Sequence, residues 1–114
     1  MKVTLRSIDL CAPTQEYVLD GLPVLIGRSA DAGVHLNDPR ASRHHCEIVE
    51  ISGTVVVRDL GSTNGTYVNG DCVKEVPLMP GHRLAIGGNC FLVSYERDES
   101  MLQANIEQEA VSQR

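Results

Sequence analysis

Short runs that alternate apolar and polar residues recur along the chain, and residues that favour turns separate them. Within residues 2 to 96 these runs show no period of 3.6 residues, the signature of an amphipathic helix. Runs of this length, spaced by about ten residues, are typical of the strands of a β-sandwich. The pattern therefore predicts an all-β fold. The expected strands cover residues 3–7, 17–19, 24–26, 34–36, 45–51, 54–59, 66–68, 83–86 and 90–95.

The domain is expected to span residues 1–96. The chain has 114 residues, of which 42% are apolar, enough for one hydrophobic core without help from a metal or a disulfide. Residues 97–114 differ, because they are polar and place Leu102, Ile106 and Ala110 at four-residue steps. We expect a C-terminal tail or linker there, either a short amphipathic helix or a disordered segment.

The distribution of charge narrows the class of ligand. A net charge of −5 argues against general nucleic-acid binding, which usually requires a basic surface. Arg28, Arg40 and Arg43 nevertheless fall within 16 positions, and a local cationic cluster on an acidic protein predicts one anionic target. No apolar run approaches the roughly 20 residues that cross a membrane, so no membrane contact is expected.

Four cysteines stand at positions 11, 46, 72 and 90, without the C-x-x-C spacing of redox or zinc sites. Their number allows two disulfides. Because the N-terminus shows no signal-peptide pattern, we expect reduced, mostly buried cysteines and a cytoplasmic protein.

Residues 61–70, GSTNGTYVNG, contain two Asn-Gly pairs five residues apart. Asn and Gly tolerate positive φ, so each pair predicts a tight turn, with room for only a very short strand between them. The first turn presents Ser62, Thr63 and Asn64, three short side chains that form hydrogen bonds. Two other loop–strand junctions contribute Arg28 and the pair Ser42–Arg43.

These residue types are the ones that a phosphorylated side chain requires. A phosphate monoester carries about −1.5 to −2 charges and three strong acceptor oxygens. Arginines supply charge and fork geometry, and hydroxyl and amide groups supply neutral donors. Because the loops of a sandwich cluster at its two ends, three distant segments can converge on one site.

Three motifs carry a resemblance to a known family: GRSADAGVHLNDPRASRHHCEI (27–48), DLGSTNGTYVNG (59–70) and LMPGHRLAIG (78–87). Together they resemble the forkhead-associated (FHA) domain, a β-sandwich that binds phosphothreonine, over roughly residues 2–95. The resemblance implies eleven strands with the recognition loops at one end. It also implies a partner protein phosphorylated on threonine by a Ser/Thr kinase.

The resemblance implies a role for each matching residue. Arg28 is expected to contact the phosphate, and Ser42 to donate its hydroxyl to it. Thr63 is expected to help fix the phosphothreonine, and Asn64 to bond the backbone of the peptide. Arg43 matches a variable position and is expected to touch either phosphate or peptide backbone.

Other positions are expected to support or tune the site. His45 resembles the structural histidine that braces the loops in the family. Loop surfaces that set the preference for flanking residues are expected to include Ser62, Arg40 and Arg43. One departure is Gly81-His82, where the family commonly has Gly-Asp, and we expect an altered local hydrogen bond there. The remaining architectural positions are Gly27, Gly65 and Asn69.

Three other functions compete with phosphopeptide binding. Zinc binding is disfavoured because the adjacent His44 and His45 would point to opposite faces of a strand, and the paired ligands at short loop spacing that zinc sites favour are missing. Catalysis is disfavoured because the set offers donors and cations but no activated nucleophile, so we expect neither an enzyme nor a cofactor. Phosphate-independent association on the same fold stays open as the alternative, although the full phosphate set is present.

The ligand is expected to be another protein, or a part of a longer parent chain. The tail after Glu96 contains no threonine. Thr14 is expected to be the only threonine that is both exposed and outside the site. The domain would therefore act as an adaptor that captures an extended phosphothreonine segment.

Overall fold

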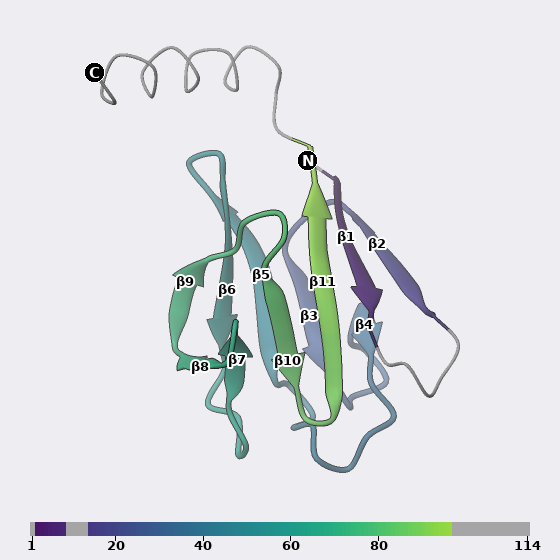
Figure 1. The fold of residues 1–114 in the computed structure, drawn as a ribbon. Coiled ribbons are helices and arrows are strands. Elements are labelled where there is room, and N and C mark those ends of the chain that lie inside the picture. The colour runs from purple at the N-terminus through teal and green to yellow at the C-terminus, as the bar shows by residue number, and fades with distance from the viewer. Residues whose placement is uncertain (1, 9–13, 97–114) are drawn as a thin grey trace, which may run out of the picture.

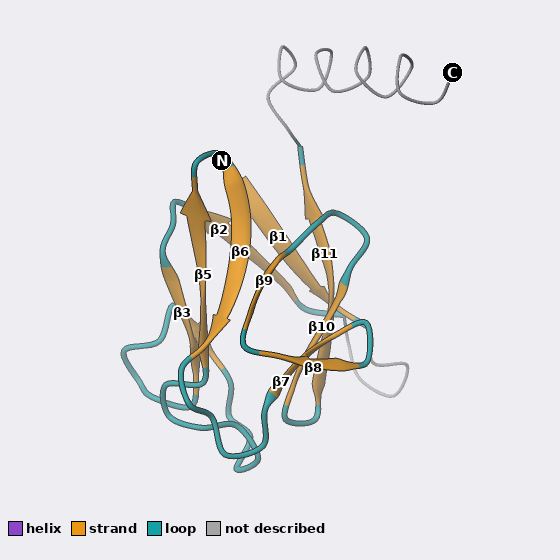
Figure 2. Ribbon diagram, turned by 90° about the vertical axis from the view of Figure 1, so that its left-hand side faces the viewer, coloured by secondary structure: helices purple, strands orange, loops and turns teal. Residues whose placement is uncertain are grey.

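The computed structural model describes residues 2–8 and 14–96. These residues form a sandwich of two β-sheets, shown face-on in Figure 1 and from the side in Figure 2. The all-β fold predicted from the sequence is confirmed, and so are the eleven strands implied by the family resemblance. The strands are β1 (Lys2–Ser7), β2 (Glu16–Asp20), β3 (Val24–Gly27), β4 (Val34–His35), β5 (Cys46–Ile51), β6 (Thr54–Asp59), β7 (Thr66–Val68), β8 (Asp71–Val73), β9 (Glu75–Pro77), β10 (Arg83–Ile86) and β11 (Asn89–Tyr95).

One sheet has six strands in the order β2-β1-β11-β10-β7-β8, and the other has five in the order β4-β3-β5-β6-β9. All pairings are antiparallel except that between β3 and β4. The ends of the described chain lie at one end of the sandwich, and most of the long loops gather at the other (Figure 2).

The core lies between the sheets, where alternate residues of each strand point inward. Val3 and Leu5 of β1 face inward from the six-stranded sheet, and Ile48 of β5 lies opposite Val57 of β6 in the other. Phe91 is buried at 2% exposure, and the ring of Tyr17 packs against it edge-on with centroids 5.8 Å apart. The alternation in the sequence thus fixes which residues fill the core.

The second Asn-Gly pair forms the tight hairpin between β7 and β8. Asn69 and Gly70 both have positive φ, 51° and 89°, as a type I′ turn requires, and Val68 pairs with Asp71 across it. The Asn69 side chain also accepts the Arg83 N–H at 2.9 Å, which ties the turn to β10. The architectural role expected for Asn69 matches this contact.

Two details differ from the predicted strands. Strand β5 begins at Cys46, one residue later than predicted, and Ser42 and Arg43 lie in the loop before it. Strands β8 and β9 have three residues each, too few for an alternation to reveal them. The tail at 97–114 falls outside the described residues, and the domain boundary at residue 96 stays a prediction.

Two expectations about exposure were wrong. Of the three described cysteines, all free, Cys46 is buried but Cys90 is only half-buried and Cys72 is exposed, because β8 is an edge strand. Thr14 is exposed as expected, but Thr54 at the β5–β6 hairpin is exposed too. Within the described residues, no helix is long and apolar enough to cross a membrane.

Candidate functional site

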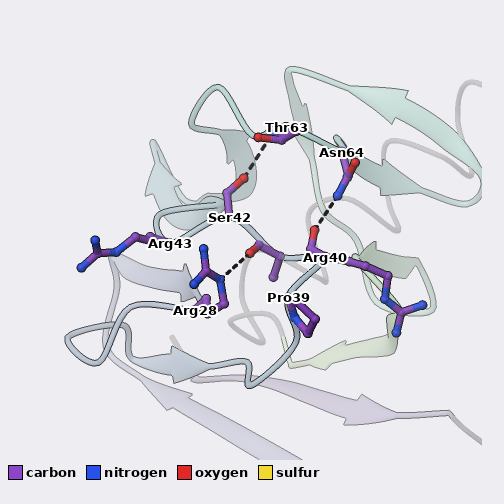
Figure 3. A pocket seen from close by; sticks show the side chains of 8 residues that line it. Arg28, Pro39, Arg40, Ser42, Arg43, Thr63 and Asn64 are labelled. Carbon is purple, nitrogen blue, oxygen red and sulfur yellow. Dashed lines mark hydrogen bonds between the residues drawn. The ribbon is translucent and has the colours of Figure 1, made fainter.

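Loops between β3 and β4, β4 and β5, and β6 and β7 meet at one end of the sandwich (Figure 2). They enclose an open cleft of about 280 Å³ (Figure 3). Five of the six residues predicted to contact a ligand line it. The lining residues are Arg28, Pro39, Arg40, Ala41, Ser42, Arg43, Thr63 and Asn64.

Gly27 allows two of these loops to meet. A Cβ built on Gly27 would lie 2.1 Å from the Arg43 carbonyl oxygen, so only glycine permits this approach of the backbones. The Arg28 N–H then donates to the Ser42 carbonyl, and the Ser29 N–H donates to that of Arg43, both at 3.0 Å. These bonds place Arg28 beside the segment that carries Ser42 and Arg43.

Arg28 is held by its inner nitrogen and presents its outer ones. Its Nε donates to the Ala41 carbonyl at 3.1 Å. The two terminal nitrogens make no hydrogen bond to any described residue, and the guanidinium lies at the cleft (Figure 3). A guanidinium that is held in one orientation, with its two terminal nitrogens unbonded, is suited to binding an anionic ligand.

His45 is fully buried and joins the β4–β5 loop to the β6–β7 loop. Its Nδ1 accepts the Ser42 N–H at 3.0 Å, and its Nε2 donates to the Gly65 carbonyl at 2.8 Å. A carbonyl can only accept, so these contacts require the neutral tautomer protonated on Nε2. His45 thus braces the loops without lining the cleft.

The β6–β7 loop supplies the opposite side of the cleft. Ser42 Oγ accepts the Thr63 N–H at 3.0 Å, which leaves the serine's own hydroxyl proton free to donate elsewhere. Asn64 Nδ2 donates to the Arg40 carbonyl at 2.8 Å. Both bonds cross the cleft between residues more than 20 positions apart, so the two loops hold each other in place (Figure 3).

Ser62 faces the interior of its own loop instead of the cleft. Its hydroxyl donates to Asp59 Oδ1 at 2.5 Å and accepts the Gly65 N–H at 3.0 Å. Asp59 also accepts from the backbone N–H groups of Gly61 and Ser62 and from the Thr66 hydroxyl. We therefore leave Ser62 out of the proposed ligand set.

Asp59 is a supporting residue that the sequence analysis missed. A signal was available, because an Asp that ends a strand just before a glycine-rich loop commonly caps the N–H groups of that loop. Burial raises the pKa of this carboxyl, but hydrogen bonds from Ser62, Thr66 and the Gly61 N–H outweigh it, so the pKa is lowered overall.

Asp38 is a second carboxylate that sequence reasoning missed. It is buried behind the cleft, where Arg40 forms an ion pair with it at 3.0 Å. Hydrogen bonds from the Arg40 side chain and backbone and from the Gly88 N–H hold the pKa of Asp38 well below its usual range. Its partners at 88 and 89 lie about 50 residues away in sequence, so no local pattern announces them.

The charge that lines the cleft is positive. Arg28 and Arg43 have no carboxylate partner among the described residues, whereas Arg40 is paired with Asp38. Arg43 and Arg40 extend to opposite sides of the cleft in Figure 3. No group of three or more His, Cys, Asp or Glu in the described part of the chain is placed to hold a metal ion.

The carboxylates of Asp38 and Asp59 should make the free energy of unfolding depend on pH in the acid range. Asp38 and Asp59 have lowered pKa values in the folded state, so their contribution is present above the ordinary value of 3.8. It is lost as the pH falls through the folded values, because the unfolded chain then binds more protons. Urea unfolding should show the free energy of unfolding falling from pH 5 to pH 2. In Asp38→Asn that fall should be smaller, and an unchanged pH dependence would contradict the role of Asp38.

The departure at His82 lies in the loop between β9 and β10, at the end of the sandwich away from the cleft (Figure 1). His82 Nδ1 accepts the Met79 N–H at 3.1 Å, and the His82 N–H donates to the Met79 carbonyl at 3.1 Å. The imidazole nitrogen accepts a turn N–H, as a carboxylate at this position would be able to do. Both hydrogen bonds of His82 stay within its own turn, and the alteration expected there stays a prediction.

The chain is similar in sequence to known proteins. Over 71 residues the chain is 38% identical to the glycogen accumulation regulator GarA of Mycolicibacterium smegmatis, a match covering 62% of this chain and 45% of GarA. The chain spans about half or less of the length of the curated relatives it matches.

Solved structures share this fold over more than four fifths of the chain. One, from a structural and functional analysis of phosphothreonine-dependent FHA domain interactions, superposes with a TM-score of 0.74 at 34% identity and covers 86% of this chain and 100% of that one. The FHA domain of FhaA, complexed with the intracellular domain of Rv3910, gives 0.70 at 36% identity and covers 81% and 99%. The family model described as FHA domain matches residues 24–87, more than half of the chain. The chain therefore belongs to the FHA domain family.

Proposed function

We propose that this FHA domain binds a phosphothreonine within an extended segment of a partner protein. The observation that carries the proposal is the convergence of Arg28, Ser42, Arg43, Thr63 and Asn64 on one cleft. Two related FHA domains support it, one from a study of phosphothreonine-dependent interactions and one in complex with a protein domain.

Charge and donors in the cleft match a phosphate. Arg28 and Arg43 bring two positive charges without carboxylate partners among the described residues, against the roughly −1.5 to −2 of a phosphothreonine. The terminal nitrogens of Arg28 and the hydroxyl proton of Ser42 are free to donate to its oxygens. Thr63 is assigned to hold the phosphothreonine and Asn64 to bond the peptide backbone beside it.

The domain is proposed to hold the phosphate and not to cleave it. The cleft is lined by cationic, hydroxyl and amide groups, and no carboxylate, thiol or imidazole lies among the lining residues. An upstream Ser/Thr kinase would create the ligand. Because that reaction consumes ATP, we place the interaction in the cytoplasm.

A preference for phosphothreonine over phosphoserine is expected. Burial of the γ-methyl is worth about 0.8 kcal/mol, and β-branching limits χ1, so less rotamer freedom is lost on binding. The preference should lie between several-fold and about 100-fold, the range of one methyl in a fitted pocket. Fluorescence anisotropy with degenerate peptide pools carrying phosphothreonine, phosphoserine or unmodified threonine would measure it.

The three pools separate the possible outcomes. Saturable binding confined to the phosphothreonine pool supports the proposal, and the enriched flanking residues would begin to define the partner. Equal binding of both phosphorylated pools would disprove a methyl pocket but keep a phosphate site. Binding that ignores phosphorylation would favour the alternative, association through other surfaces of the sandwich.

A further inference from the structure

Asp38 lies behind the cleft and does not line it. Its side chain is 10% exposed and accepts five hydrogen bonds. Three come from Arg40, through the backbone N–H at 2.9 Å, Nε at 3.0 Å and Nη2 at 3.2 Å. Two come from the β10–β11 hairpin, through the Gly88 N–H at 2.9 Å and Asn89 Nδ2 at 3.0 Å. Asp38 thus fastens the β4–β5 loop to a hairpin that contributes no lining residue.

The segment that Asp38 fastens is the one that orients two side chains of the cleft. The Ala41 carbonyl accepts from Arg28 Nε at 3.1 Å, and the Arg40 carbonyl accepts from Asn64 Nδ2 at 2.8 Å. Long polar side chains at a surface sample several rotamers unless a bond selects one. The positions of Arg28 and Asn64 therefore depend on where the backbone at 40–41 is held.

The hairpin packs tightly enough to transmit this constraint. A Cβ on Gly87 would lie 3.1 Å from Asp38 Oδ2 and 3.3 Å from the Ala41 nitrogen. A Cβ on Gly88 would lie 1.8 Å from Arg40 Nη2, so the guanidinium occupies the space that a side chain would need. The two adjacent glycines let the hairpin approach the loop from behind.

We propose that Asp38 is a positioning residue for the phosphopeptide site, with the β10–β11 hairpin as its support. Asp38 holds the backbone at 40–41, and the carbonyl groups of that backbone orient the side chains of Arg28 and Asn64 for the ligand. Arg40, although it lines the cleft, serves mainly to hold Asp38. The inference rests on the proposed function for its link to ligand binding, but the placement of the side chains can be measured without ligand.

The test is Asp38→Asn, which keeps the shape of the side chain but removes its charge and turns one acceptor into a donor. Anisotropy with the degenerate phosphothreonine pool should show binding weakened by about fivefold to 30-fold, the effect of one or two lost buried contacts. In the ligand-free protein, the ¹⁵N–¹H resonances of Arg28 Nε and Asn64 Nδ2 should shift and broaden. Neither resonance would respond if Asp38 only stabilised the fold.

A double-mutant cycle distinguishes positioning from independent contributions. In the Asp38→Asn background, Arg28→Ala should cost several-fold less affinity than in the parent, because Arg28 is already misplaced. Glu47→Gln is the matched control. Glu47 is also a carboxylate paired with an arginine, Arg58 at 3.2 Å, but it lies within strand β5 and this pair holds no loop of the cleft. The affinity of Glu47→Gln for the phosphothreonine pool should stay within about twofold of that of the parent.

Each outcome decides the proposal. A folded Asp38→Asn with unchanged Arg28 and Asn64 resonances, or with fully additive effects in the cycle, would overturn it. If that variant does not fold, Asn89→Ala decides, because it removes one donor and keeps the carboxylate. It should shift the same two resonances and weaken binding about twofold to fivefold. If the parent binds none of the peptide pools, the proposed function fails, and the ligand-free resonances alone test the role of Asp38.

Discussion

Arg28→Ala is expected to weaken binding of a phosphothreonine peptide by about tenfold to 150-fold, or about 1.5 to 3 kcal/mol. The substitution would remove the charge-assisted hydrogen bond proposed between Arg28 and the phosphate. Arg43 would then be the only unpaired arginine among the lining residues to face the phosphate. The Arg28 guanidinium is already oriented by the Ala41 carbonyl, so little side-chain entropy is lost when it binds. Titration by fluorescence anisotropy with a phosphothreonine peptide selected from the pool would measure the change.

Two further variants serve as controls for Arg28→Ala. Arg28→Lys keeps the charge but loses the fork and the bond to Ala41, so it should recover only part of the affinity. Arg6→Ala removes an exposed arginine from β1, which supplies no lining residue, and should leave binding within about twofold. Arg28→Ala that bound as tightly as the parent would show that Arg28 does not contact the phosphate.

Gly27→Ala is expected to lower the free energy of unfolding by about 3 to 5 kcal/mol, a large part of the stability of a small domain. The new Cβ would meet a backbone oxygen at 2.1 Å, which cannot move aside as the end of a side chain can. The loops must separate, and three backbone hydrogen bonds across this junction weaken with them: Arg28 to Ser42, Ser29 to Arg43 and His45 to Ile26. Urea unfolding followed by circular dichroism would measure the loss.

Gly33→Ala is the matched control, because it makes the same substitution in the neighbouring loop. The nearest contact of its Cβ would be one methyl group of Val24 at 2.9 Å, and the next atom would lie 3.7 Å away. Its cost should be less than half that of Gly27→Ala. Equal losses in the two variants, or a loss below about 1 kcal/mol in Gly27→Ala, would mean that the close approach of the loops does not limit stability.

Much of the fold follows from local chemistry. Alternation placed the long strands because a sheet with one buried face needs an apolar residue at every second position, as Ile48 and Val57 show. The Asn69–Gly70 turn was predictable because few residues accept positive φ at two successive positions. Strands β8 and β9 were not, because three residues carry no readable period and their pairing comes from neighbours distant in sequence.

The sequence likewise predicts some features of the candidate site and not others. The residue types that line the cleft stand in recognisable motifs, so the sequence predicts Arg28, Ser42, Arg43, Thr63 and Asn64 as one set. Ser62 belonged to the same motif and has the same chemistry as Ser42, yet its hydroxyl turns toward Asp59. The sequence shows which functional group stands at a position, but it does not show which rotamer the neighbouring elements impose on that side chain.

The sandwich, its core and the set of polar groups offered to a ligand follow from the sequence alone, because periodicity and turn chemistry act between residues close in the chain. Which of these groups meet in the cleft, and which hold the others in place, depends on how the two sheets and their loops pack. The contact of Gly27 with the Arg43 carbonyl and the bonds of Asp38 to Gly88 and Asn89 both join separate loops. Such contacts exist only after the two sheets have packed, since packing brings the loops of one end together.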